Sequence, residues 1–211
     1  MENKQTKGFT LIELLVVIGI VAILSAVVIL TLNPAELLKQ SRDSNRLSDM
    51  ATLKSALSLY LADVTTPNLA SSSFGAATYN YNGCYVTNGQ TAANVSTTAA
   101  GCGLFAAGTY VALSVASGTS ANLRNVNGTG WIPVDLTTIS AGAPVGSLPV
   151  DPSNTGPLFY AYRASSTLVF EINVSGIESS KFTTGANDVR STDGGNRNDI
   201  YEVGTAPGLL L

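Results

Sequence analysis

The segment Lys7-Gly8-Phe9-Thr10-Leu11-Ile12-Glu13 leads directly into an uncharged, apolar run, Leu14–Leu32. As an α-helix this run would cover roughly 28 Å, which is close to the hydrocarbon thickness of a bilayer. Glu13 stands immediately before it. Because a carboxylate in the membrane costs about 2.5–3.5 kcal/mol even on lenient insertion scales, a glutamate at this place indicates a function. The stretch therefore predicts a membrane-spanning helix with one functional acid near its start.

The residues before the run are polar and carry Lys4 and Lys7. Positive charge ahead of an apolar run keeps that end in the cytoplasm, so the rest of the chain should face outward. A secretory signal would end in a small-residue cleavage site, which Ala22-Ile23-Leu24-Ser25-Ala26 loosely imitates. The apolar run continues past that point to Leu32, which favours a retained anchor.

Gly8 followed by Phe9-Thr10-Leu11-Ile12-Glu13-Leu14-Leu15-Val16-Val17 resembles the prepilin signal of type IV pilins and of the pseudopilins of type II secretion. The resemblance implies that a membrane peptidase cleaves between Gly8 and Phe9 and methylates the new amino terminus of Phe9. It also implies that Glu13 pairs with the amino terminus of a neighbouring subunit during assembly. Such a pairing is physically favourable, since a buried carboxylate is tolerated when a cation pairs with it. The alternative is a plain single-pass anchor with a chance glutamate.

After the apolar run, Asn33-Pro34 predicts a kink, because proline lacks an amide hydrogen and clashes with the preceding turn. An amphipathic helix should then continue to about Asp63. Its apolar residues are spaced three, three, four and three apart, which places them on one helical face: Leu47, Met50, Leu53, Leu57 and Tyr60. The charged residues point in other directions and are interpreted as a solvated or inter-subunit face: Lys39, Arg42, Asp43, Arg46 and Asp49.

Strand patterns in the rest of the chain predict an exported head with an antiparallel sheet. The strands are expected at Tyr79–Val86, Tyr110–Val115, Leu158–Arg163 and Leu168–Val174. In the last of these, one face is wholly apolar and carries Leu168, Phe170, Ile172 and Val174, whereas Val169, Glu171 and Asn173 point the other way. The apolar face can therefore pack on the helix. Trp131 is interpreted as a core or loop-anchoring aromatic, with ligand binding as the alternative.

The predicted fold class is therefore α+β and pilin-like: a long N-terminal α-helix, with a membrane half and an amphipathic half, packed on a small antiparallel sheet. We expect a leader at residues 1–8, a membrane and filament-core half at 9–34, an amphipathic half at 35–66 and a globular head at 67–211. The head should end in an acidic C-terminal loop.

Two sequence features bear on cross-linking and metal binding. Cys84 and Cys102 are the only cysteines, and export favours one disulfide between them over two free thiols. The glycine-rich, acidic tail suits the oxygen coordination of calcium, with Asp188, Asp193 and Asp199 as candidate ligands. Its composition resembles the calcium loop of major pseudopilins. Its spacing does not match an EF-hand, and a solvated turn cluster is the alternative.

Composition limits the function classes. The chain has no histidine, which excludes histidine-based acid–base catalysis and removes the commonest transition-metal ligand. Its net charge is −3 and it has no clustered basic patch, so direct nucleic-acid binding is not expected. No catalytic motif is present, and no cofactor is required beyond the possible Ca²⁺. We expect a filament subunit that polymerises with itself and is stored in the inner membrane. The resemblance implies a prepilin peptidase/methyltransferase, an assembly platform and a motor as partners, with the final filament periplasmic or extracellular. The alternative is a membrane-tethered adhesin or a minor tip or initiator pilin.

Overall fold

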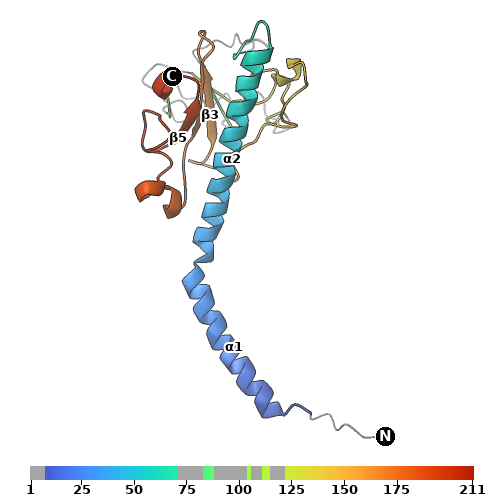
Figure 1. The fold of residues 1–211 in the computed structure, drawn as a ribbon, viewed down its shortest axis with the longest axis vertical. Coiled ribbons are helices and arrows are strands. Elements are labelled where there is room, and N and C mark those ends of the chain that lie inside the picture. The colour runs from blue at the N-terminus through green and yellow to red at the C-terminus, as the bar shows by residue number, and fades with distance from the viewer. Residues whose placement is uncertain (1–7, 71–82, 88–103, 106–110, 115–121) are drawn as a thin grey trace, which may run out of the picture. The chain divides into compact units, whose positions relative to one another are not determined.

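The computed structural model describes residues 8–70, 83–87, 104–105, 111–114 and 122–211 (Figure 1). The chain divides into two compact units, Met1–Lys39 and Gln40–Leu211. Each unit is described by itself below.

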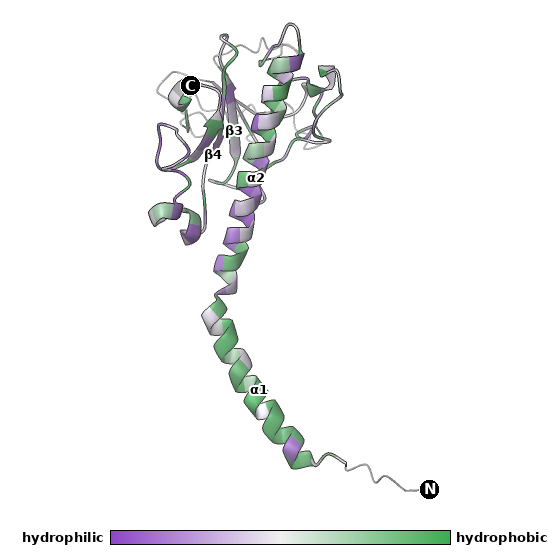
Figure 2. Cartoon of the chain, viewed as in Figure 1, coloured by the Kyte–Doolittle hydropathy of each residue, from purple (hydrophilic) through white to green (hydrophobic). Residues whose placement is uncertain are grey.

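The first unit contains α1, Leu11–Leu32, which Thr10 caps at its N-terminus. The helix is apolar along nearly its whole length (Figure 2), and Leu11–Ile29 is long and apolar enough to cross a membrane. It ends at Asn33, whose backbone is left-handed with φ of 42°. The predicted interruption is confirmed here, because Pro34 cannot donate the amide hydrogen that a continuous helix needs and Asn tolerates the left-handed region.

The second helix, α2, spans Pro34–Asp63, so its C-terminal end lies where the amphipathic pattern predicts it. In the head, α2 buries four of the five residues of the predicted apolar stripe against the sheet, and the fifth, Leu47, is half-buried. Met50, Leu53 and Leu57 have no exposed surface, and Tyr60 is 5% exposed. They join one core with aromatic residues from the sheet and its flanking loops: Trp131, Tyr160, Tyr162 and Phe170.

The sheet has five strands in the order β2-β1-β3-β4-β5. Their bounds are β1 Gly83–Val86, β2 Val111–Ser114, β3 Tyr160–Ala164, β4 Phe170–Val174 and β5 Tyr201–Gly204. Strands β1, β3, β4 and β5 pair in antiparallel fashion, whereas β2 adds to β1 in parallel. The predicted α+β, pilin-like fold class is confirmed. The strand β5 and the parallel pairing of β2 were not predicted.

The second face of the sheet is also covered. Alternate residues of β1 and β3, including Cys84 and Ala161, form a smaller core with Leu104 and Phe105. Strand β4 is buried at every position, so the alternation of its sequence does not correspond to a buried and a solvated face. We call the face of the sheet that points away from α2 the outer face.

The interpretation of Trp131 as a core aromatic is confirmed. Its side chain has no exposed surface, and Nε1 donates to the carbonyl of Pro149 at 2.8 Å. Cys84 is buried in the outer-face core, whereas Cys102 lies outside the described residues. The disulfide between them stays a prediction.

Candidate functional site

The three residues of the predicted processing and assembly site, Gly8, Phe9 and Glu13, lie within six residues of one another at the start of α1, and all three are exposed. Gly8 and Phe9 are exposed, and Thr10 adopts an extended backbone that begins the helix. The Thr10 backbone amide donates to Glu13 Oε2 at 2.8 Å, and its hydroxyl donates to the same oxygen at 2.6 Å. In return, the Glu13 amide donates to Thr10 Oγ1 at 3.3 Å. This reciprocal arrangement is a capping box, which satisfies the free amides at a helix start.

The capping box has a consequence for the carboxylate. Both bonds from Thr10 end on Glu13 Oε2, and no described residue donates to Oε1. One oxygen of Glu13 is therefore held by its own helix, while the other is available to a cation from outside. Glu13 lies in the first turn of an apolar helix whose large side chains are exposed from Leu11 onward.

Comparison with known families supports this reading of the N-terminus. Residues 3–29 match the family described as the prokaryotic N-terminal methylation motif. The chain carries a prepilin-type signal. The match supports a type IV pilin-like or pseudopilin precursor, and the motif implies processing by a prepilin peptidase and assembly into a filament. Neither the curated proteins nor the solved structures gave a match.

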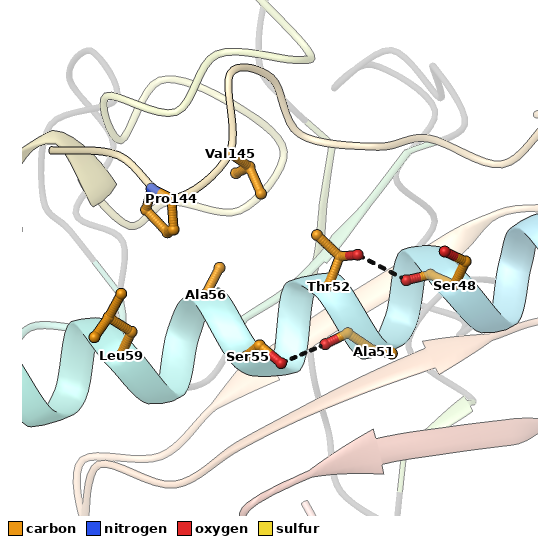
Figure 3. A pocket seen from close by; sticks show the side chains of 8 residues that line it. All are labelled: Ser48, Ala51, Thr52, Ser55, Ala56, Leu59, Pro144 and Val145. Atoms are coloured by element: carbon orange, nitrogen blue, oxygen red, sulfur yellow. Dashed lines mark hydrogen bonds between the residues drawn. The ribbon is translucent and has the colours of Figure 1, made fainter.

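The N-terminal helix and the signal together fit an inner-membrane-anchored pilin. They also suggest a structural protein and not an enzyme. A groove along α2 is lined by Ser48, Ala51, Thr52, Ser55, Ala56, Leu59, Pro144 and Val145 (Figure 3). The hydroxyls of Thr52 and Ser55 donate to the carbonyls one turn earlier, those of Ser48 and Ala51, and so leave mainly methyl and methylene groups facing the groove.

The prediction that the charged face of α2 is solvated or inter-subunit is wrong for its central residues. Asp43 and Arg46 have no exposed surface. Arg46 donates to Asp151 through Nε at 2.7 Å and through Nη2 at 3.0 Å, which makes a bidentate pair. Its Nη1 donates to Asp43 and to Glu178, both at 2.7 Å. We call Arg42, Asp43, Arg46, Asp151 and Glu178 the Arg46 cluster.

The outer members of the cluster complete its hydrogen bonding. Arg42 forms a second bidentate pair with Glu178, both bonds being 2.8 Å. Asp43 accepts the backbone amides of Glu178 and Ser179, and Asp151 accepts those of Ser153 and Asn154. The charge is therefore buried with its partners, which is the condition under which a buried ion pair is tolerated.

The cluster shifts the pKa values of its members. Hydrogen bonds from Arg42 and then Arg46 lower the pKa of Glu178 to about 2, against the opposing effect of burial. Burial alone would lower the pKa of Arg46, but hydrogen bonds to Asp151 and Glu178 raise it overall. Glu178 and Arg46 therefore stay charged at neutral pH.

The outer face of the sheet holds buried carboxylates of a different kind. Glu171 has no exposed surface and accepts from Asn173 Nδ2 at 2.7 Å and from the backbone amide of Leu211 at 2.9 Å. Burial raises the pKa of Glu171 to about 7 and that of Glu202 to about 6. The buried oxygens Glu202 Oε1 and Asn173 Oδ1 have no donor among the described residues, although these two residues are register partners in β4 and β5.

The three predicted calcium ligands are not brought together around one point. Asp188 pairs with Arg190 at 3.0 Å, and Asp199 accepts from Arg197 Nε at 2.9 Å. Asp193 instead accepts the backbone amides of Gly195 and Glu202. No group of three or more His, Cys, Asp or Glu side chains in the described part of the chain is arranged to hold a metal ion. Calcium binding in this loop stays a prediction.

Proposed function

We propose that this chain is a structural subunit of a type IV pilus or pseudopilus-type filament. The observation that carries the proposal is the position of Glu13, which is capped by Thr10 at the start of an exposed apolar helix and lies five residues after Gly8. Before assembly the helix would anchor the chain in the inner membrane with Lys4 and Lys7 on the cytoplasmic side.

Cleavage between Gly8 and Phe9, followed by methylation of Phe9, would leave the whole apolar helix on the mature subunit. It would also create a cationic amine close to the membrane surface. In the low dielectric of a filament core, a carboxylate and an amine from neighbouring subunits attract far more strongly than in water. The available oxygen of Glu13, Oε1, suits this contact, because Thr10 already occupies the other oxygen.

Processing is tested by mass spectrometry of the protein from membranes and from sheared filaments. The expected mature chain begins at N-methylated Phe9, and a further loss of two hydrogens would report the disulfide between Cys84 and Cys102. A mature chain that still contains Met1–Gly8 would contradict the proposed processing. A Gly8→Val precursor is the matched control, because it should remain uncleaved.

Assembly is tested with Glu13→Val. Membrane insertion should be unchanged, because the substitution makes the helix more apolar, but the filament yield should fall to background since the incoming amine has no partner. Glu36→Val is the control: this glutamate lies in the first turn of α2, outside the apolar run, and its loss should leave the yield unchanged. Normal filament yield from Glu13→Val would overturn the assembly role. A mature chain that is confined to membranes or scarce in filaments would favour a tethered or minor subunit.

A further inference from the structure

We propose that the Arg46 cluster locks the axial register of α2 on the sheet of the head. This role is separate from membrane anchoring and filament assembly, because all five residues of the cluster lie in the second unit, Gln40–Leu211. The lock would give every copy of the head the same position along its helix.

The cluster sits at the open end of the β3–β4 hairpin. Asp151 lies in the segment that leads into β3, and Glu178 lies in the segment that leaves β4. One turn of α2 holds both, since Arg46 bonds to each of these carboxylates at 2.7 Å. The two ends of the hairpin are thereby tied to the same point on the helix.

The apolar stripe by itself discriminates poorly between registers. Leu47, Met50, Leu53 and Leu57 recur about once per turn, so a shift of one turn replaces most apolar side chains by others. Burial of apolar surface is non-directional and roughly proportional to area, and much of it would survive such a shift. A second type of contact is needed to select one position.

The charges around Arg46 supply that selection. Asp43 and Asp49 stand three residues before and after it. A one-turn shift in either direction would therefore bring an aspartate toward Asp151 and Glu178. Asp151 would then share its buried site with a second carboxylate in place of its arginine, which is far more unfavourable than the paired arrangement.

A shift of four residues is also disfavoured. In one direction Met50 would face Asp151 and leave that buried acid unpaired, while Arg46 would stand where Arg42 now meets Glu178. In the other direction Arg42 would reach the acids, but Arg46 would move into the apolar site that Met50 fills with no exposed surface. Selection of register is the best-attested use of buried polar and ionic groups, because their geometry admits few partners.

The test measures the distance between spin labels on α2 and on the hairpin turn, in the full chain in detergent. Labels at Ser55→Cys and Ser166→Cys report the register, since both positions are exposed. The lock is removed by Asp43→Asn, Arg46→Met and Asp151→Asn together, which deletes its central charges but keeps acceptors for the backbone amides. The expected result is a second or broadened distance population, displaced by about 5 Å, one helical turn.

A single population with the wild-type mean and width would overturn the proposal. Tyr160→Phe is the control: it removes another helix-to-sheet hydrogen bond, from Tyr160 Oη to Asp49 at 2.7 Å, and should leave the distribution unchanged. If the triple variant does not fold, Arg46→Lys keeps the charge without the bidentate fork and should broaden the distribution. An unchanged width for that variant would equally contradict the lock.

Discussion

The head contains two groups of buried carboxylates that solve the burial of charge in opposite ways. In the Arg46 cluster every acid, including the partly exposed Glu178 at its edge, has an arginine partner, and the pKa of Glu178 falls to about 2. On the outer face Glu171 receives only hydrogen bonds from an amide side chain and a backbone amide, and its pKa rises to about 7. The comparison teaches that the partner, and not burial alone, decides whether a buried acid keeps its charge.

The largest expected effect comes from removing the central cation of the first group. Arg46→Met leaves Asp43 and Asp151 buried without their partner, and breaking a buried pair in this way costs about 3–5 kcal/mol. Urea unfolding followed by the fluorescence of Trp131, the single tryptophan, measures the loss. Arg197→Met removes a partly exposed local pair and should change the stability by less than about 0.5 kcal/mol. Equal losses of stability from Arg46→Met and Arg197→Met would contradict the special contribution of the buried pair.

The second group should respond to pH in the opposite sense from the first. Because the folded pKa of Glu171 lies above its ordinary value of 4.5, its contribution is present at pH below 4.5 and is lost as pH rises through about 7. Glu171→Gln should therefore be more stable than wild type at pH 8, by about 2 kcal/mol, with a flatter profile between pH 4.5 and 7. Asp199→Asn is the control, since that carboxylate is exposed. A wild-type profile that rises across this range would contradict the assignment.

Glu178 sharpens the comparison from the acid side. Its folded pKa is lowered, so its contribution is present above pH 4.5 and is lost as pH falls toward 2. Glu178→Gln should lower the stability at pH 7 by about 1 kcal/mol, because the carboxylate is partly exposed, and should match wild type near pH 2. Melting curves of both proteins at pH 2, 4.5 and 7 provide the measurement. A difference that persists at pH 2 would show that shape, and not charge, produced it.

The smallest effect concerns the acidic loop beside the outer face. If Asp188, Asp193 and Asp199 bind calcium, free calcium equal to the Kd should stabilise the full chain by about 0.4 kcal/mol, and more at higher concentration. The melting temperature in calcium, in magnesium and in EDTA tests this. The triple Asn variant should lose the response. The calcium prediction would be wrong if the melting temperature of the wild-type protein did not depend on calcium. The arginines would then be the only cationic partners of Asp188 and Asp199 in the described residues.

Much of the architecture was predictable from local sequence patterns. The helix break at Asn33-Pro34, the end of α2 near Asp63 and the buried stripe all follow from proline geometry and helical periodicity. Strands β3 and β4 were found within two residues at each end. Strand β5 was missed, because Tyr201–Gly204 has only four residues and follows a stretch rich in Asp, Gly and Asn. The outer-face core was missed because the alternation of β4 predicts a solvated second face, and only contacts distant in sequence cover it.

The N-terminal site was predictable in a way that the Arg46 cluster was not. Glu13 stands out because a carboxylate at the edge of a membrane-spanning segment is costly, and its hydrogen bonds are with Thr10, only three residues away. Arg46 and Asp151 are 105 residues apart. On the helix Arg46 looks like one more member of a charged face, and the acids that flank the hairpin have no distinguishing spacing.

The amino-acid sequence by itself determined the apolar N-terminal helix, the prepilin-type signal, the break before α2 and most of the face of α2 that is buried, because each depends on chemistry within a few turns of chain. Only the tertiary structure decided which charges are buried and with which partners. A side chain's ionisation depends on the dielectric and the donors around it, and those come from segments that folding alone brings together.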